Sequence, residues 1–491
     1  MKTLKIIFLI LSCAAILSGC SKSDLPGNEQ ANAVLKSPLV AGTVIPVGLP
    51  NGVDDTEALK AAFAAAISHG PGAVVQLEEG EYNLGFIEVR EFCGTFKGAG
   101  TGKSVITSLN DLDIAPLVNQ DLNTYLIKFV GGNVYMSDMT VKTPPGVLTS
   151  DAGEWWIEGL VSFCARNRQY ASNADYIEAV VNNVDFISGN EPVSGWKSNC
   201  NNGITVGIDS RYTQIPGGWP LSPTDITITN CKFTNFDIYG VLIEHLSAGN
   251  IIVGTKNNGN IFTDNSTKDY GYGASTGIWH NVNVDISVVD NIFNIPSFAY
   301  FGIELTSAPW LSWLQHVNQT KTTVFNIEGN QFNITGGIGG VFVNDYRRFS
   351  YADALPMLLQ VKNNHFEMSE GAFTAMGCFN LSGAVIRNNQ FSGNGSFGVR
   401  IMRNAPVYNE NGLMLGNNFS NSAFSVTTVL LNTGSRNWTI VGGDLGELVS
   451  DYGENNLITG FNMSTADVPL GETIMDNIED MRVAIKSLKG N

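Results

Sequence analysis

Charged residues recur at matching places in the second half of a chain that is otherwise poor in charge. Only 15% of the 491 residues are charged. The candidate catalytic residues lie within or directly after short apolar runs that contain glycine: Glu244, His245, Glu304, Asp345, Arg347 and Arg400. Because charge is scarce, its collection at repeated places predicts a functional surface there.

These residue types suit two reactions of polysaccharides. Glu304 and Asp345 are expected on neighbouring turns of a repeat structure, with carboxylates roughly 5–9 Å apart, a range that covers retaining and inverting hydrolysis. Glu244 is expected two coils before Glu304, which puts the two residues roughly 10 Å apart at the usual spacing between neighbouring strands. Alternatively, Arg347, Arg400, His245 or Tyr346 could serve a β-elimination. That reaction needs a base for the proton α to a uronate carboxyl, and a cation or Ca²⁺ to neutralise that carboxyl. For any one residue, an ordinary solvated polar face is the alternative interpretation.

Aromatic residues accompany the charged ones. The candidate substrate-binding residues are Trp279, Trp310, Trp313, Tyr346 and Arg348. Tryptophan on loops beside a charged face suits sugar rings, whose C–H faces stack on aromatic surfaces. The alternative is that these tryptophans pin long loops to the body. A polysaccharide is therefore the predicted partner.

A repeated phrase must position these residues. An alternating apolar run is followed by a polar pair, usually with Asn, and then by Phe. The phrases end at residues 233, 262, 293, 332, 366, 391 and 419, which are 25 to 39 residues apart. A drifting period of this size predicts a solenoid with inserted loops. We call the phrase strand A, and the glycine-containing run that follows each Phe strand B.

The phase of strand B predicts which of its residues face outward. The expected outward column is Leu242, Trp279, Glu304, Phe342, Phe379 and Arg400, with Glu244 and Asn344 in the next column. The asparagines two residues before each Phe are predicted to form an internal turn ladder, because Asn tolerates left-handed backbone and its amide can bond the coils above and below. The Phe residues are predicted to stack in the core.

The start of the chain carries the clearest resemblance to a known fold. Asp54-Asp55-Thr56-Glu57 opens an amphipathic helix that His69-Gly70-Pro71-Gly72 ends, and Gly80-Glu81-Tyr82 and a glycine-rich turn follow. This order resembles the pectate-lyase-like right-handed parallel β-helix superfamily. The resemblance implies an all-β fold: a single-stranded right-handed parallel β-helix (solenoid) over residues 46–465 with an N-terminal capping helix. Helical spacing of apolar residues predicts a short C-terminal capping helix at 466–491.

No catalytic subfamily of that superfamily is matched. Gly277-Ile278-Trp279-His280 lacks the Asp of the pectate lyase motif, and Val399-Arg400-Ile401-Met402 only faintly resembles the polygalacturonase Arg-Ile-Lys. The reaction therefore stays open between polysaccharide lyase and glycoside hydrolase. The rivals are a non-catalytic, adhesin-like glycan-binding surface protein and a purely structural solenoid.

The first residues form a targeting signal. Lys2 and Lys5 precede an apolar stretch at 6–16, and Leu17-Ser18-Gly19-Cys20 resembles a lipobox. Residues 1–19 are thus the expected signal peptide, Cys20 the lipidation site, and 20–45 a tether. The predicted location is the cell envelope, lipid-anchored, with the residues after Cys20 resembling an outer-membrane destination of Bacteroidetes-like lipoproteins.

Charge and cysteine content limit the remaining possibilities. The net charge of −17 and the lack of a basic stripe exclude a nucleic-acid binder. The surplus of acid leaves Ca²⁺ open as a cofactor, although no metal-ligand motif is present. Cys231 and Cys378 lie inside the repeats and are predicted to be small buried residues. A Cys164–Cys200 disulfide is left open.

Overall fold

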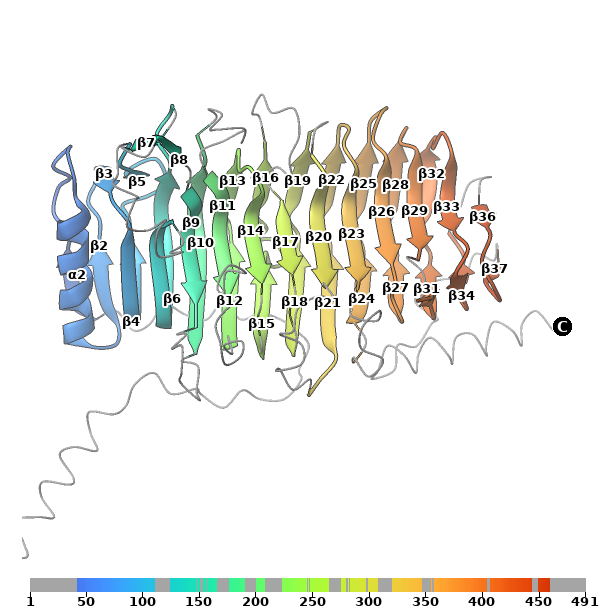
Figure 1. Ribbon diagram of the computed structural model, residues 1–491, viewed down its shortest axis with the longest axis horizontal. Helices are drawn as coiled ribbons and strands as arrows, with labels where there is room; N and C mark the ends of the chain where they lie inside the picture. The colour runs from blue at the N-terminus through green and yellow to red at the C-terminus, as the bar shows by residue number, and fades with distance from the viewer. Residues whose placement is uncertain are drawn as a thin grey trace, which may run out of the picture.

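The protein is an elongated solenoid in which the chain runs steadily from one end to the other (Figure 1). The computed structural model describes residues 42–110, 124–146, 148–150, 153–155, 157–165, 176–189, 200–207, 223–244, 246, 248–264, 275–279, 281, 283–296, 299–307, 320–346, 355, 357–403, 407–443 and 449–459. In this part of the chain, 33 strands join in one sheet. Every pairing within that sheet is parallel, so the right-handed parallel β-helix predicted from the sequence is confirmed.

Each regular coil contributes one strand to each of three ladders. Ladder A contains β1 (Val44–Pro46), β2 (Ala73–Gln76), β4 (Ile87–Lys97), β6 (Tyr125–Lys142), β10 (Ile177–Ile187), β12 (Pro223–Thr229), β15 (Ala248–Val253), β18 (Val284–Val289), β21 (Thr323–Glu328), β24 (Met357–Lys362), β27 (Ala384–Arg387), β31 (Gly412–Leu415), β35 (Thr439–Val441) and β37 (Leu457–Thr459). Ladder F, which carries the repeated phenylalanines, contains β3 (Gly80–Leu84), β5 (Ser104–Ser108), parts of β6 and β10, β13 (Lys232–Thr234), β16 (Ile261–Thr263), β19 (Ile292–Ile295), β22 (Gln331–Ile334), β25 (His365–Met368), β28 (Gln390–Gly393) and β32 (Asn418–Ser422).

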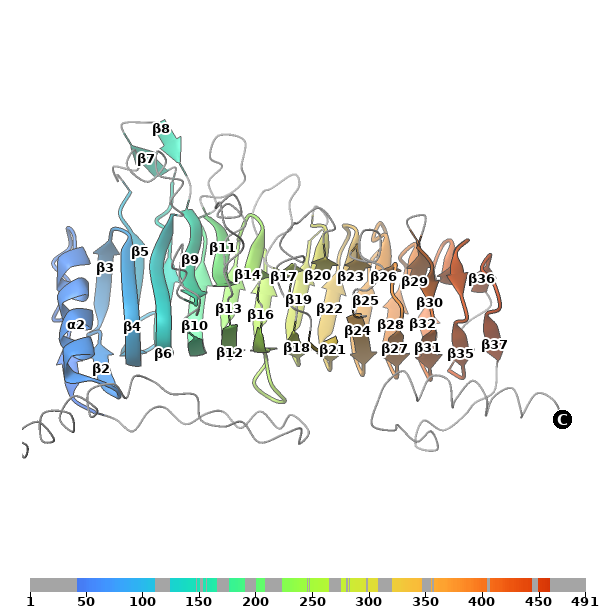
Figure 2. The ribbon, with the colours of Figure 1, turned by 60° about the horizontal axis from the view of Figure 1, so that its bottom comes forward.

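Ladder B corresponds to strand B of the sequence. It begins in β4 and β6 and continues through β9 (Ile157–Cys164), β11 (Cys200–Gly207), β14 (Tyr239–Glu244), β17 (Thr276–Trp279), β20 (Phe301–Ser307), β23 (Gly339–Asp345), β26 (Thr374–Phe379), β29 (Phe397–Met402), β33 (Thr427–Leu431) and β36 (Val449–Asp451). Two short pairs lie outside the main sheet: β30 (Asn409–Glu410) with β34 (Ser435–Arg436), and the antiparallel hairpin β7 (Leu148–Ser150) with β8 (Gly153–Trp155). The hairpin stands away from the solenoid (Figure 2).

Helix α2 (Thr56–His69) covers the first coil, as predicted. Its buried face includes Leu59 and Phe63, and the Phe63 ring packs 5.2 Å from that of Phe92 on β4. Ile67, on the same helix, is 41% exposed. Strand β1 pairs with β2 from Val44, so the last two residues assigned to the tether, Val44 and Ile45, belong to the first coil. The predicted C-terminal helix at 466–491 lies outside the described residues.

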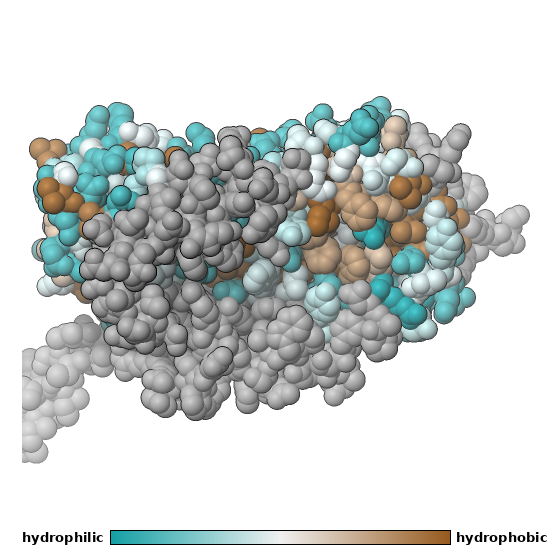
Figure 3. All heavy atoms as spheres, turned by 45° about the horizontal axis from the view of Figure 1, so that its top comes forward, coloured by the Kyte–Doolittle hydropathy of each residue, from teal (hydrophilic) through white to brown (hydrophobic). Residues whose placement is uncertain are grey.

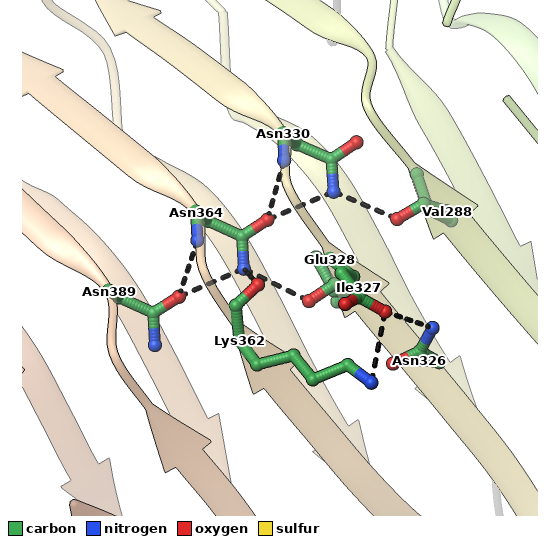
Figure 4. Close-up of polar contacts among 8 residues, drawn as sticks. All are labelled: Val288, Asn326, Ile327, Glu328, Asn330, Lys362, Asn364 and Asn389. Atoms are coloured by element: carbon green, nitrogen blue, oxygen red, sulfur yellow. Dashed lines mark hydrogen bonds and ion pairs between the residues drawn. The ribbon is translucent and has the colours of Figure 1, made fainter. Parts of the chain in front are cut away.

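An asparagine ladder runs through the turn between ladders A and F. Its members are Asn260, Asn291, Asn330, Asn364, Asn389 and Asn417, with Cys231 in front. Each side-chain oxygen accepts the backbone N–H of the preceding coil at 2.8–3.0 Å. Each amide donates to a backbone carbonyl of the preceding coil at 2.8–2.9 Å (Figure 4). The predicted ladder is therefore confirmed, with its polar groups satisfied inside the protein.

The left-handed backbone falls one residue earlier than predicted. The positive φ angles belong to the residue before the ladder position in six of the seven turns, at Asn230, Asp290, Gly329, Asn363, Asn388 and Gly416, with Gly259 before Asn260 as the exception. In these turns, one residue adopts the left-handed backbone that reverses the chain, and the next residue forms the hydrogen bonds to the neighbouring coil. The turn also splits the sequence phrase into two strands, one in ladder A and one in ladder F. The phenylalanine therefore lies on the third strand of the coil, which the sequence alone left unassigned.

The phenylalanines of ladder F stack through the core. Neighbouring ring centroids from Phe186 to Phe419 lie 4.2–5.1 Å apart, with interplanar angles of 4–12°. Four of the five described cysteines, Cys164, Cys200, Cys231 and Cys378, are buried and form no disulfide, so the Cys164–Cys200 disulfide left open by the sequence is absent. The fifth, Cys93, is disulfide-bonded.

Replacing one ladder asparagine tests its structural role. In Asn330→Ala, the buried N–H of Asn291 and the carbonyl of Val288 lose their partners. Unsatisfied buried groups cost about 1–3 kcal/mol each, so we expect a loss of about 3 kcal/mol or more in the free energy of unfolding, measured by urea titration. The control Gln331→Ala changes the exposed neighbour and should cost less than about 1 kcal/mol. Equal effects of the two variants would contradict the ladder's importance.

Candidate functional site

Glycines at the start of the ladder B strands turn aromatic residues outward. A Cβ atom on Gly240 would lie 2.8 Å from Phe233 and Phe262, and one on Gly398 would lie 2.9 Å from Phe419. These glycines therefore pass directly over the phenylalanine stack, where no side chain fits. The residue before each such glycine points away from the core. Tyr239, Phe301 and Phe397 occupy this place and do not belong to the central core cluster.

The strand register defines two further outward columns on ladder B. The first contains Leu242, Gly277, Glu304, Phe342, Gly377, Arg400 and Leu430. The second contains Glu244, Trp279, Thr306, Asn344, Phe379 and Met402. The single column predicted from the sequence was thus wrong for Trp279 and Phe379, which lie two residues further along their strands. They still share the outward face with Glu304 and Arg400.

Glu304 lies in a polar pocket formed by three coils. The ring of Tyr239, on β14, lies across Gly277 of the next coil, and its hydroxyl donates to Oε2 of Glu304 one coil further on. The Thr306 hydroxyl lies 3.4 Å from Oε1 of Glu304. Trp279 packs edge-on against Tyr239, with ring centroids 5.4 Å apart. Gly277 is required for this arrangement, because a Cβ there would lie 2.7 Å from the Tyr239 ring.

Burial raises the pKa of the Glu304 carboxyl. Glu304 is 9% exposed, and desolvation raises its pKa above the ordinary glutamate value. Hydrogen bonds with Tyr239, Thr306 and Trp279 lower the pKa but do not cancel the effect of burial. A raised pKa favours the protonated form of the carboxyl, which is the form that a general acid needs.

The other predicted carboxylates occupy different places. Asp345 lies in the coil next to Glu304, as predicted, but its register partner is Ser307. It follows the outward residue Asn344, alternates to the opposite side of the strand and is 1% exposed. The predicted Glu304–Asp345 pair across one sugar is therefore not formed on the outward face. Glu244 does share that face and is 3% exposed, with its Cα about 12 Å from that of Glu304 by strand spacing and rise.

Arg400 lies in the same column as Glu304, closer to its C-terminal end. Three coil steps separate the two residues, or about 14 Å at the usual strand spacing. The two groups cannot contact each other. Figure 3 shows hydrophobic side chains gathered beside hydrophilic ones in the C-terminal half of one face. Among the large hydrophobic residues exposed in this half of the chain are Phe373 and Val426, which directly precede β26 and β33.

Of the remaining predicted site residues, the structure describes Tyr346, which directly follows β23 and is half-buried. His245, Trp310, Trp313, Arg347 and Arg348 lie outside the described residues, as does Cys20. These assignments stay predictions.

Sequence reasoning missed the aromatic residues that begin ladder B. Tyr239 and Phe301 were read only as parts of strands, and Phe397 was not considered. A signal was present in the recurring order of aromatic residue, glycine and β-branched residue: Tyr239-Gly240-Val241, Phe301-Gly302-Ile303 and Phe397-Gly398-Val399. Once the Phe stack is known to exclude a side chain at the glycine, the preceding aromatic residue must face outward.

Neither a metal centre nor a spanning helix is found in the part of the chain that the structure describes. No group of three or more His, Cys, Asp or Glu residues is arranged there to hold a metal ion. Ca²⁺ therefore stays a prediction without an assigned site. Among the same residues, no helix is long and apolar enough to cross a membrane.

Comparison with known proteins finds similar folds only. No protein-family model and no curated protein sequence matches the chain. The A-module of mannuronan C-5 epimerase AlgE6 from Azotobacter vinelandii is 14% identical, with a TM-score of 0.44 over 87% of this chain and 100% of that chain. The catalytic domain of a GH87 alpha-1,3-glucanase is 11% identical, with a TM-score of 0.43 over 86% and 70% of the two chains. A family 28 exopolygalacturonase from Yersinia enterocolitica is 11% identical, with a TM-score of 0.38 over 86% and 79%. At such identities no residue correspondence follows.

The raised pKa of Glu304 predicts a pH-dependent gain from Glu304→Gln. The native state holds the Glu304 proton more tightly than the unfolded state, so the stability it provides is complete below the unfolded pKa and is lost as pH rises through the folded pKa. Glu304→Gln should therefore unfold at higher urea concentration than the wild type at about pH 8. Near pH 4, roughly the unfolded glutamate value, the difference should vanish. The exposed Glu367→Gln should change little at either pH. A gain from Glu304→Gln that is independent of pH would contradict the assignment.

Proposed function

We propose that this protein binds and cleaves a polysaccharide along the outward face of ladder B. One observation supports this most directly: Glu304, a buried carboxyl with a raised pKa, lies on a face lined by aromatic side chains. Aromatic rings offer stacking surfaces for sugar rings, and a protonated carboxyl can give its proton to a glycosidic oxygen. The ladder extends over many coils, which suits a long linear chain.

Acid-assisted hydrolysis is favoured over β-elimination at Glu304. In elimination, the base and the cation must act on the same uronate, within contact distance of its C–H bond and its carboxyl. Arg400 lies about 14 Å from Glu304 along the column, too far for both to serve one sugar. Glu244 is the second carboxylate on the same face and is our candidate for the base or nucleophile. A lyase would have to use other residues.

The rival is a glycan-binding protein without catalysis. It is supported by the hydrogen bonds to both oxygens of Glu304, which suit a purely structural carboxyl. The two functions differ in turnover. A binding protein retains a glycan on a column without releasing reducing ends or unsaturated products.

Substitution of Glu304 tests the catalytic proposal. We expect the wild type to release reducing ends from one member of a panel of neutral and acidic polysaccharides. Glu304→Gln should lower the rate by at least about 100-fold, since a positioned acid contributes about 10²–10⁴-fold. Glu367→Gln, exposed on ladder F, is the control and should retain the wild-type rate. Turnover that survives in Glu304→Gln would move the site elsewhere. Ultraviolet absorbance of an unsaturated uronate product would identify a lyase instead.

We also propose that the protein is an envelope lipoprotein anchored through Cys20. The support is the basic start, the apolar stretch and the Leu17-Ser18-Gly19-Cys20 lipobox. Expressed in a bacterium fed radiolabelled palmitate, the full chain should incorporate the label and sediment with outer membranes. Cys20→Ala should lose both properties, while Cys378→Ala, deep in the core, should retain the label. Membrane attachment of Cys20→Ala would contradict the anchor.

A further inference from the structure

Arg400 is a half-buried cation without an acidic partner. Nine described lysines and arginines form ion pairs: Lys60, Arg90, Lys97, Lys128, Lys142, Lys232, Lys321, Lys362 and Arg436. Arg400 is not among them, and its Nε is buried without a hydrogen-bond partner in the described part of the chain. A guanidinium has five N–H donors, so this side chain can still bind an incoming acceptor.

Two phenylalanines hold the Arg400 guanidinium in place. Its Cζ lies 4.6 Å from the ring centroid of Phe373 and 4.9 Å from that of Phe397. The two rings pack edge to face, 5.3 Å apart. Such cation–π contacts fix a guanidinium without using its donors, which remain available for a planar anion.

The neighbours of Arg400 in its column carry no charge. Along its column, Arg400 has Gly377 in the preceding coil and Leu430 in the following one. The next acidic residue in that column is Glu304, about 14 Å away. Burial lowers the pKa of Arg400, yet arginine stays charged near neutral pH. A cation taken partly out of water ordinarily has a partner, and no residue in the described part of the chain forms an ion pair with Arg400.

The register neighbour of Arg400 in the preceding coil, Gly377, has no side chain and is buried between aromatic rings. A Cβ atom on Gly377 would meet only the rings of Phe379 and Phe342, at 3.3 and 3.7 Å. Gly377 therefore forms a flat surface, here called the floor, between the rings of Phe342 and Phe379 and beside Arg400 in the strand register. A sugar ring placed on such a floor would bring a substituent within reach of the guanidinium.

We propose that Arg400 binds a carboxylate or sulfate group of an acidic polysaccharide whose sugar ring lies over Gly377. The proposal rests on the proposed function and specifies its ligand class. The net charge of −17 does not oppose it at physiological salt, where charges beyond about 8 Å are largely screened. Planar, two-pronged contact with the anion would give Arg400 the acidic partner that it does not have among the described residues.

The test compares charged glycans with neutral glycans of the same backbone. The probes are oligogalacturonate and its carboxyl-reduced form, and dextran sulfate and dextran, with binding measured by calorimetry at about 0.15 M salt. The wild type should bind at least one charged probe more tightly than its neutral counterpart by about tenfold or more. The carboxylate and sulfate pairs identify which group is recognised.

Three variants separate recognition from general attraction and from misfolding. Arg400→Gln should lose the preference for the charged probe, while Arg400→Lys should keep part of it. Arg387→Gln removes the same charge from ladder A and should bind like the wild type. Gly377→Val keeps the charge but fills the floor, so it should weaken charged and neutral probes together. This variant and Arg400→Lys keep the test informative where Arg400→Gln fails to fold.

Each result decides between the two proposals. Equal binding of charged and neutral probes by the wild type overturns the role of Arg400 and leaves the proposed function standing. An equal loss in Arg387→Gln and Arg400→Gln also overturns it, because the attraction would be general. Failure of the wild type to bind any glycan, charged or neutral, overturns both proposals.

Discussion

The stacking of one phenylalanine per coil is the constraint on which the regular part of this solenoid depends. The ring spacing of 4.2–5.1 Å matches the distance of about 4.8 Å between neighbouring parallel strands. A slip of one residue would move a ring from the core to the opposite face. The asparagine ladder reinforces the same register, because its amides bridge the turns between coils. Together they fix the phase of every strand that follows.

That phase determines the chemistry of the outer surface. The ring stack occupies the space beneath the start of ladder B, so glycine is required there at Gly240, Gly302 and Gly398. The glycine in turn directs the preceding aromatic residue outward. Tyr239 is placed in this way over Gly277, from where it reaches Glu304 two coils further on. A packing requirement of the core thereby produces the environment of the candidate acid.

The sequence predicted the fold and the internal ladders because their signals repeat in every coil. Asparagine and phenylalanine at a recurring offset leave few other interpretations. The outward columns were harder to predict, because the glycine of each strand B run does not occupy the same place in every coil. Gly277 pairs with Leu242 and Glu304, whereas Gly240 and Gly302 come two residues earlier in their strands, so aligning the glycines put Trp279 in the column of Glu304. The pair of Glu304 and Asp345 failed because Asp345 lies three residues after Phe342, the register partner of Glu304, and an odd offset turns it to the opposite side of the strand.

The separation of Glu304 and Arg400 follows from the solenoid itself. In a globular protein, a half-buried cation and a buried carboxyl on one surface can approach each other and neutralise both charges. In a parallel β-helix the coils stack at a fixed spacing, and residues three coils apart in one column stay about 14 Å apart. The Glu304 carboxyl and the Arg400 guanidinium therefore cannot offset each other's cost of removal from water. For the carboxyl, burial raises the pKa and so favours the neutral form, whereas arginine remains charged. The same rigid spacing thus makes Glu304 suited to proton transfer and leaves Arg400 in need of an anion from outside the chain.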